Sequence, residues 1–419
     1  MEAQTSLFKK VFLIIAFFLL NFSILCGGNF QLLGPFSLRH IAMFALFGFA
    51  FLNKSQIPMK QFMLSLYLIY LGVYTLCNII NGEVTTHSFL QSFYTYHVPC
   101  IALIVGLPAI LKNKEQVHLF VLSLACLYIF DVVLTILQYM NNGLAWAIAT
   151  RISSSAEDGM ESAEMYAEAS GSLFGYSLVA GAFGFVVTNG YFLATYLPVL
   201  TNRINTNKFK DVFISSILLG IGAVAIFVTQ QRMAFISLLL YLGYFVYYGM
   251  SKGYRIPIVI IAILFSLFYL DPTSIDMGRL TTDTNNDTRM RLFDDFFKFL
   301  DSDQWAFGGA VHYLNTYHKA QHNTFLSAWV LGGIFTFVTY LILYYKLLES
   351  CICNLKLLRQ YRQYYPLTLS CAIASSIFLI YSITHSVGVQ SGSPIFWIVY
   401  VLMVISYRYE SEEKTISYK

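Results

Sequence analysis

Two arginines and one histidine in the second half of the chain have side chains suited to anion binding and proton transfer. The first, Arg232, ends a short Thr-Gln-Gln-Arg run between two apolar segments, so its guanidinium should lie at a membrane surface. An arginine in that position either snorkels to lipid head groups or grips a phosphate with its planar fork. On the side of the membrane where Arg232 is predicted to lie, the short loops contain few other basic residues. Its presence there favours phosphate binding over a general role in contacting lipid head groups.

The second arginine lies in residues 287–300, whose spacing predicts an amphipathic helix. The predicted apolar stripe comprises Leu292, Phe293, Phe296, Phe297 and Leu300. Arg289 precedes Phe293 by four residues and should face inward with this stripe, where a buried cation needs an anionic partner. That partner is either a structural aspartate or a substrate phosphate. Arg291 precedes Asp295 by four residues and is expected on the polar face, in a solvated ion pair.

The histidine, His322, lies in a Gln-His-Asn-Thr-Phe run where a long loop meets the next apolar segment. Imidazole is well suited to accept a proton near neutral pH, although a histidine here could instead cap the helix. Asn323 follows directly, and Glu161 and Glu164 lie in an earlier loop. These three residues and Arg291 are secondary candidates for contacting a substrate. The acids around Glu161 fall mostly on one helical face, which is also typical of a solvated surface.

Three aspartates and the cysteines carry weaker signals. Asp301 and Asp303 form a D-x-D pattern that can hold a divalent cation, but three residues are little evidence in a loop rich in aspartate. We therefore predict no metal site. Asp131 is the one acid expected inside a span, where it is either functional or part of a hydrogen-bonded helix contact. The seven cysteines include no CxxC pair, so neither a disulfide framework nor a zinc site is expected.

The elements that position these side chains are predicted to be transmembrane helices. Hydrophobic residues make up 57% of the 419 residues, charged residues make up 11%, and the mean hydropathy is +0.62. A soluble domain carries roughly 25% charged residues, so lipid must be the solvent for much of this chain. Apolar runs of suitable length predict about twelve spans. They are 11–26, 32–52, 61–80, 98–111, 117–139, 172–200, 212–228, 233–248, 256–270, 324–345, 367–384 and 395–407.

The distribution of basic residues predicts the orientation of these spans. With the N-terminus in the cytoplasm, most of the 26 Lys and Arg residues fall in cytoplasmic segments, and only Arg39 and Arg232 lie in short external loops. Both termini are then cytoplasmic, and the long loops 141–170 and 271–321 are external. Long loops with their own sequence pattern commonly carry function. The predicted fold is therefore a single all-α polytopic bundle, residues 1–419, with short amphipathic helices in two external loops.

The order of these features resembles the O-antigen polymerase and O-antigen ligase superfamily, which includes the Wzy-type polymerases. The resemblance covers residues 229–345, with a short external turn, a helical hairpin, a long loop and two glycine pairs. The residues that carry it are Arg232, Arg289, Phe293, Gly308, Gly309, His322, Asn323, Leu331, Gly332 and Gly333. The family often has a small residue at the position of Gln231 and usually has Trp at that of Phe293. Neither difference removes a chemical group that the reaction needs.

The resemblance implies an inverting, metal-independent glycosyl transfer at the external face of a bacterial inner membrane, with no cofactor. The donor would be a glycan on undecaprenyl pyrophosphate. Arg232 and Arg289 resemble the family's pyrophosphate-binding arginines, and His322 resembles its candidate base. The acceptor is another lipid-linked repeat unit in a polymerase and the lipid A core in a ligase. We favour a polymerase of O-antigen, capsular or exopolysaccharide units.

The expected partners are the lipid-linked donor and acceptor, membrane lipids and a chain-length regulator protein, with no nucleic acid. Two other functions are compatible with parts of the pattern. A flippase for lipid-linked sugars would share the span count, but it needs polar groups through the membrane interior, where Asp131 is nearly alone. A metal-dependent lipid-linked sugar transferase would use Asp301 and Asp303.

Overall fold

The chain folds into a bundle of helices in the computed structural model. The described residues are 7–26, 31–33, 36–53, 61–85, 89–90, 93–153, 160–161, 179–183, 186–205, 209–249, 286–318, 321, 323–361, 364–384 and 388–417. The predicted span 256–270 lies outside these residues, as do half of loop 141–170 and the first part of loop 271–321.

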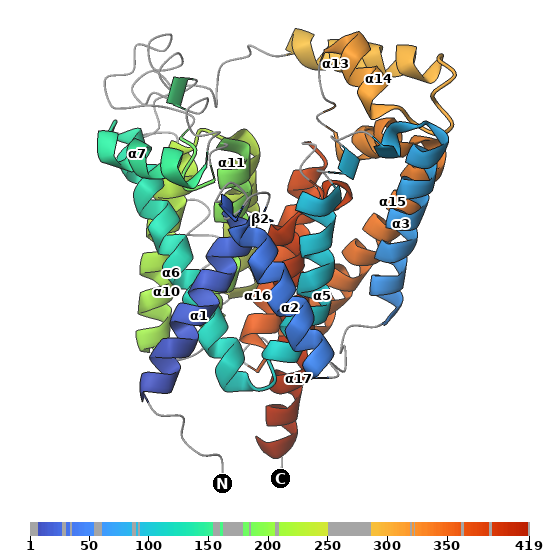
Figure 1. The fold of residues 1–419 in the computed structure, drawn as a ribbon. Coiled ribbons are helices and arrows are strands. Elements are labelled where there is room, and N and C mark those ends of the chain that lie inside the picture. The colour runs from blue at the N-terminus through green and yellow to red at the C-terminus, as the bar shows by residue number, and fades with distance from the viewer. Residues whose placement is uncertain are drawn as a thin grey trace.

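The long helices run between two ends of the bundle (Figure 1). We call the end at which α1 begins and α17 ends the proximal end; α13 and α14 lie at the opposite, distal end. The helices are α1 (Leu7–Leu25), α2 (Leu38–Leu52), α3 (Gln61–Ile80), α5 (Val98–Ile110), α6 (Lys114–Tyr139), α7 (Gly143–Ile152), α9 (Val186–Leu200), α10 (Phe209–Val228), α11 (Arg232–Gly249), α13 (Asn286–Leu300), α14 (Ala310–Tyr317), α15 (Thr324–Leu358), α16 (Pro366–Ser382) and α17 (Pro394–Ser417). Shorter helical turns are η1 (Glu83–Thr85), η2 (Phe93–His97), η3 (Asn202–Asn205), η5 (Arg359–Tyr361) and η6 (Val389–Ser391).

Apolar side chains on the outside of the bundle indicate that lipid surrounds it. Phe12 on α1 is 62% exposed and Phe213 on α10 is 56% exposed, which water would disfavour. In the described part of the chain, six helices are long and apolar enough to cross a membrane, namely those in α1, α3, η2 with α5, α6, α10 and α15. Shorter apolar helices lie in α2, α11 and α16. These helices confirm the predicted helical membrane fold but do not establish the number of spans.

Several helix ends differ from the predicted span boundaries. The span predicted to begin at residue 32 instead opens with an antiparallel ladder of β1 (Gln31–Leu33) and β2 (Phe36–Ser37), and α2 starts only at Leu38. Ser37 stops the helix from extending backwards because its backbone N–H donates to Nδ1 of His40, 2.8 Å away. The span predicted from 172 starts as a helix at Val186, after a turn at 179–183, and α15 runs past 345 to Leu358.

Helix α16 is the centre of the bundle. Small buried residues such as Ala372, Ala374 and Ser375 let neighbouring helices approach closely, so α9, α15 and α17 all pack against it. Aromatic rings fill the space further along, with Phe378 5.2 Å from the Tyr191 ring of α9. The hydroxyl of Tyr344 on α15 donates to the carbonyl of Leu379 over 2.8 Å. Helices that carry candidate site residues are thereby fixed to one common core.

Candidate functional site

Arg232 is the first residue of α11, directly after the turn that joins it to α10. The turn is tight and buried: Thr229, Gln230 and Gln231 are 0%, 5% and 7% exposed. Gln230 takes a left-handed φ of 55°, and the Thr229 hydroxyl donates to the carbonyl of Ile226 over 2.7 Å. Arg232 itself is exposed, so the structure places an accessible guanidinium at a helix N-terminus, where backbone N–H groups also favour an anion.

The turn before Arg232 is held by two neighbouring helices. A Cβ atom at Gly190 of α9 would lie 3.3 Å from Cβ of Gln231 and 3.0 Å from the hydroxyl oxygen of Tyr381, so only glycine fits comfortably here. The ring of Tyr381 on α16 in turn lies 3.8 Å from that of Tyr191 on α9, centroid to centroid. This packing fixes the turn that precedes Arg232 against α9 and α16.

The predicted amphipathic helix exists as α13, but its buried face differs from the predicted stripe. Leu292, Phe296 and Phe299 are 5%, 4% and 0% exposed, whereas Phe293 and Phe297 are 44% and 61% exposed. The reason is the direction of the neighbours: Phe299 packs edge-on against Tyr313 of α14, with the ring centroids 5.5 Å apart. The helix therefore turns its other flank outward. The side chains of Arg289 and Arg291 lie outside the described part of the structure.

Gln321 joins the loop helices just before the candidate base. It is 4% exposed, and its Nε2 donates to the carbonyl of Leu292 on α13 over 2.8 Å and to the hydroxyl of Tyr313 on α14. Our sequence reasoning did not select this residue, and its only signal was a polar side chain next to His322. His322 itself lies outside the described residues.

Asn323, on the other side of His322, is the N-cap of α15. Its Oδ1 accepts from the backbone N–H of Phe325 and of Leu326, over 2.8 and 3.2 Å. Both neighbours of His322 are therefore anchored, one to α13 and α14 and the other to α15. The sequence analysis proposed Asn323 only as a secondary substrate contact, and the structure shows that it also caps α15.

The two glycine pairs of the sequence pattern meet in space. The N–H of Gly309 donates to the carbonyl of Val330 over 2.9 Å, and a Cβ atom at Gly308 would lie 2.6 Å from Cα of Gly332. Gly332 and Gly333 interrupt α15 with non-helical backbone angles, and Gly333 has a φ of 69°. The helix is kinked where the loop backbone touches it, and side chains at these positions would force the two apart.

Asn78 of α3 and Asn81, which directly follows this helix, hold this junction through backbone carbonyls. Nδ2 of Asn78 donates to the carbonyl of Leu331, which the kink exposes, over 3.0 Å. Nδ2 of Asn81 donates to the carbonyl of Phe307 in the loop over 2.6 Å. The long loop is thus attached to α3 as well as to α15.

Glu83 of η1 caps the N-terminus of α14. Its Oε1 accepts from the N–H of Val311 over 3.0 Å. Burial raises the pKa of Glu83 above its ordinary value, while hydrogen bonds from the backbone N–H groups of Val311, His312 and Ala310 oppose that rise. A carboxylate at this position favours the positive end of the helix. Our sequence reasoning missed Glu83, because an acid in a short turn carries no distinctive pattern.

A buried polar cluster lies beneath Asn323. The hydroxyl of Thr324 donates to Oε1 of Gln390 over 2.5 Å and lies 2.9 Å from the hydroxyl of Tyr340. The hydroxyl of Tyr70 on α3 donates to the carbonyl of Gln390 over 2.9 Å. Tyr70, Thr324, Tyr340 and Gln390 thus join α3, α15 and η6 under the start of α15.

The remaining acidic candidates are exposed where they are described. Asp301 and Asp303 are exposed, and no group of three or more His, Cys, Asp or Glu among the described residues is arranged to hold a metal ion. Glu161 is exposed, and Glu164 lies outside the described residues.

Asp131 is fully buried in α6 and has a structural contact. Its Oδ1 accepts from the N–H of Ala182 over 2.7 Å. About two helical turns after Asp131, the Gln138 amide exchanges two hydrogen bonds with the backbone of Gly181, over 2.9 and 3.1 Å. The two side chains fix the turn at 179–183 against α6, which fits the interpretation of Asp131 as a hydrogen-bonded helix contact.

The comparisons with known proteins bear on the same part of the chain. No curated protein matches the sequence. The family model described as O-antigen ligase matches residues 217–341, a range that begins within α10 and ends within α15. It contains Arg232, the whole of α13 and the segment 321–323. This match confirms the resemblance to the O-antigen polymerase and ligase superfamily, to which residues 217–341 of the chain correspond.

Proposed function

We propose that this protein is a membrane glycosyltransferase that polymerises glycan repeat units carried on undecaprenyl pyrophosphate. One observation carries the proposal: the range matched by the family model contains all three residues selected for chemistry, namely Arg232, Arg289 and His322. The structure supports it further, since Arg232, α13 and the segment around His322 belong to elements at the distal end.

In the proposed topology, the distal end is the external face of a bacterial inner membrane and about twelve spans cross it. The start of α1 and the end of α17 lie at the same end, as an even number of crossings requires (Figure 1). A reporter fused after Lys419 should then read cytoplasmic, and one inserted near Thr284 should read external. An external C-terminus would overturn this topology and place the candidate residues on the wrong face.

The arginines supply the electrostatic part of the reaction. The donor pyrophosphate is a permanent anion, and its leaving group gains negative charge as the bond to the sugar breaks. Arg232 offers a bidentate grip at a helix N-terminus. The spacing of the sequence predicts that Arg289, three residues before Leu292 and seven before Phe296, faces inward. Two cations stabilise departure of the pyrophosphate without a metal ion.

His322 supplies the base. Its imidazole takes the proton from the acceptor hydroxyl, whose oxygen then attacks the anomeric carbon from the face opposite the pyrophosphate. The bond between that carbon and the phosphate oxygen breaks, a glycosidic bond forms with inversion, and the carrier leaves as the pyrophosphate. The anchored side chains of Gln321 and Asn323 support this role, since a base must be held in position to act.

A ligase is the second candidate, because the matching family model is described as O-antigen ligase. The two functions differ only in the acceptor. Purified protein should therefore be given the lipid-linked repeat unit alone and, separately, with the lipid A core. Polymer on the pyrophosphate carrier in the first reaction supports a polymerase, whose chain length a regulator protein would then set. Transfer to lipid A core alone supports a ligase, and no glycan transfer in either reaction refutes both.

A further inference from the structure

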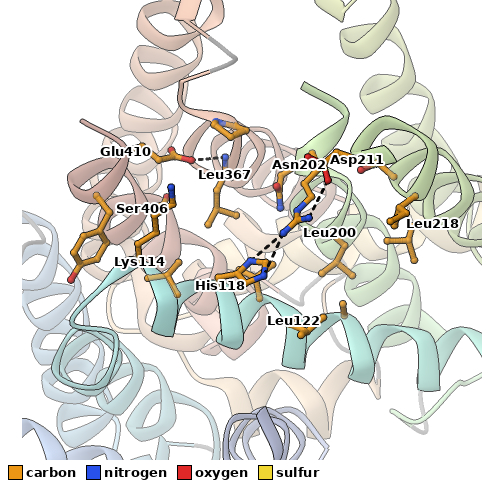
Figure 2. A pocket seen from close by; sticks show the side chains of 18 of the residues that line it. Lys114, His118, Leu122, Leu200, Asn202, Asp211, Leu218, Leu367, Ser406 and Glu410 are labelled. Carbon is orange, nitrogen blue, oxygen red and sulfur yellow. Dashed lines mark hydrogen bonds and ion pairs between the residues drawn. The ribbon is translucent and has the colours of Figure 1, made fainter. Parts of the chain in front are cut away.

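The proximal end of the bundle contains a cavity that the proposed reaction does not use. It has a volume of about 730 Å³ and lies between α6, α10, α16, α17 and η3 (Figure 2). Pockets of about 300–1,000 Å³ commonly hold small organic ligands. Its walls come from four distant parts of the sequence, so none of our motifs pointed to it.

One part of the cavity is apolar. Val121 and Ala125 of α6 face Ile214 and Leu218 of α10 across it, and Leu200 of α9 contributes a further apolar side. None of these side chains offers a hydrogen bond. This part suits a hydrocarbon chain, whereas a polar ligand would lose its hydrogen bonds with water and gain none from these side chains.

The other part of the cavity carries cations. Lys114, Arg203 and Lys210 all line it and are all exposed. Arg203 bridges two neighbours: its Nη1 lies 3.1 Å from Oδ1 of Asp211, and its Nη2 lies 3.4 Å from Nε2 of His118. Figure 2 shows His118 and Asp211 on this side of the cavity. The bridge holds the Arg203 guanidinium between His118 of α6 and Asp211 of α10.

The two carboxylates that line the cavity offset these three cations only in part. Asp211 already pairs with Arg203, and Glu410 turns its oxygens to the start of α16. There, Glu410 accepts from the N–H of Leu367 and of Thr368, over 3.0 and 3.1 Å. Burial raises the pKa of Glu410, which lies beyond the predicted span 395–407, to about 7, so its charge is partial at neutral pH. The charged side of the cavity is therefore net positive.

We propose that this cavity binds one anionic phospholipid of the proximal leaflet. The lipid phosphate lies among Lys114, Arg203 and Lys210, and an acyl chain lies along Val121, Ala125 and Leu218. Charge complementarity selects this occupant over a zwitterionic lipid, because basic pockets between transmembrane helices bind anionic head groups. The apolar half selects a lipid over free phosphate, because it gains only by covering hydrocarbon.

The test uses the full chain in nanodiscs that contain equal amounts of phosphatidylglycerol and phosphatidylethanolamine, with the retained lipid identified by native mass spectrometry. The wild type should retain one phosphatidylglycerol molecule in preference to phosphatidylethanolamine. The variant with Lys114→Gln, Arg203→Gln and Lys210→Gln should retain about tenfold less phosphatidylglycerol, as expected for loss of cations near a lipid surface. Ala125→Trp, which fills the apolar part, should lower retention of both lipids.

The matched control neutralises three cations at the same end that do not line the cavity, through Lys9→Gln, Lys356→Gln and Arg359→Gln. It should retain phosphatidylglycerol as the wild type does. If the triple cavity variant is unstable, Lys210→Glu alone replaces it, since Lys210 is exposed. Equal retention of the two lipids by the wild type would overturn the proposal. So would unchanged retention by the cavity variants, or complete displacement of the lipid by inorganic phosphate.

Discussion

The two ends of the bundle use polar residues in opposite ways. At the distal end, uncharged side chains make the hydrogen bonds: Gln321 and Asn323 bind backbone groups, and the buried Gln390 accepts from the hydroxyl of Thr324. At the proximal end, the cations around the cavity are exposed, and Arg203 is held by a charged neighbour and a histidine. Neutral hydrogen bonds are directional and unaffected by salt, so they suit a site that needs fixed geometry. Attraction between exposed charges depends little on their exact geometry and is screened by salt, so it suits a mobile head group at close range.

The largest effect expected at the distal end is the loss of the base. His322→Ala should lower turnover by about 10²–10⁴-fold, because an acceptor hydroxyl is a poor nucleophile near neutral pH. Donor binding should persist, since Arg232 and Arg289 contact a permanent anion. The measurement is binding of the lipid-linked donor beside polymer formation, on folded, inserted protein, with Lys356→Gln as a control of unchanged activity. Near-normal polymer from His322→Ala would leave His322 as a structural cap.

The next effect separates the two loop arginines. Arg289→Ala should abolish polymer formation, because the helical spacing of the sequence predicts that Arg289 faces inward and binds the donor pyrophosphate. Arg291→Ala should retain much of the activity, since the spacing of the sequence predicts only a solvated ion pair with Asp295, and such a pair contributes little. Parallel assays of the two variants, with donor binding measured for each, would check this. A dead Arg291→Ala beside an active Arg289→Ala would show that the inward flank has been assigned to the wrong arginine.

A smaller effect tests the packing between the long loop and the kink of α15, and not the proposed reaction. Gly333→Ala places a side chain against the backbone of Ala306 at a left-handed φ, so it should destabilise the protein by roughly 1–3 kcal/mol. Thermal unfolding in detergent measures the change, and activity should fall with it. The matched control is Gly220→Ala, because Gly220 in α10 has open space around its Cα and should tolerate the change. Equal stability of the two variants would contradict a rigid junction at the kink.

The smallest effect concerns pH at the proximal end. The folded-state pKa of Glu410 is about 7, above the value of 4.5 for a free carboxyl. The protonated form is thus favoured by folding, and its contribution is complete below pH 4.5 and is lost as pH rises through 7. The melting temperature of the wild type should fall by a few degrees between pH 5 and pH 8, and that of Glu410→Gln should change less. A parallel decline in both would assign the pH effect to another group.

The sequence predicted the parts of the site that depend on local pattern. The tight turn before Arg232 and the helix after Asn286 follow from residues next to one another, and both exist. The buried flank of α13 could not be predicted fully, because Phe293 and Phe299 are equally apolar and only the position of Tyr313 decides between them.

Contacts between distant segments could not be predicted from the sequence either. Glu83 caps a helix 228 residues later, and the proximal cavity joins Lys114 to Glu410. Local composition and spacing do not indicate either pairing, because each of these residues is an ordinary charged residue next to an apolar run. The roles of the predicted site residues are still predictions, whereas the match over 217–341 confirms the resemblance that suggested them.

The way α3 holds the long loop has a consequence for how such proteins diversify. Asn78 and Asn81 bind the carbonyls of Leu331 and Phe307, atoms that every residue type provides. The outward side chains of this region, among them Phe293, Phe297 and Trp305, take no part in that attachment. Mutation can therefore rewrite the loop's outer surface while the anchoring bonds persist. Under the proposed function, exchange of these outward residues changes which sugars are accepted, while the bonds of Asn78 and Asn81 keep the scaffold unchanged.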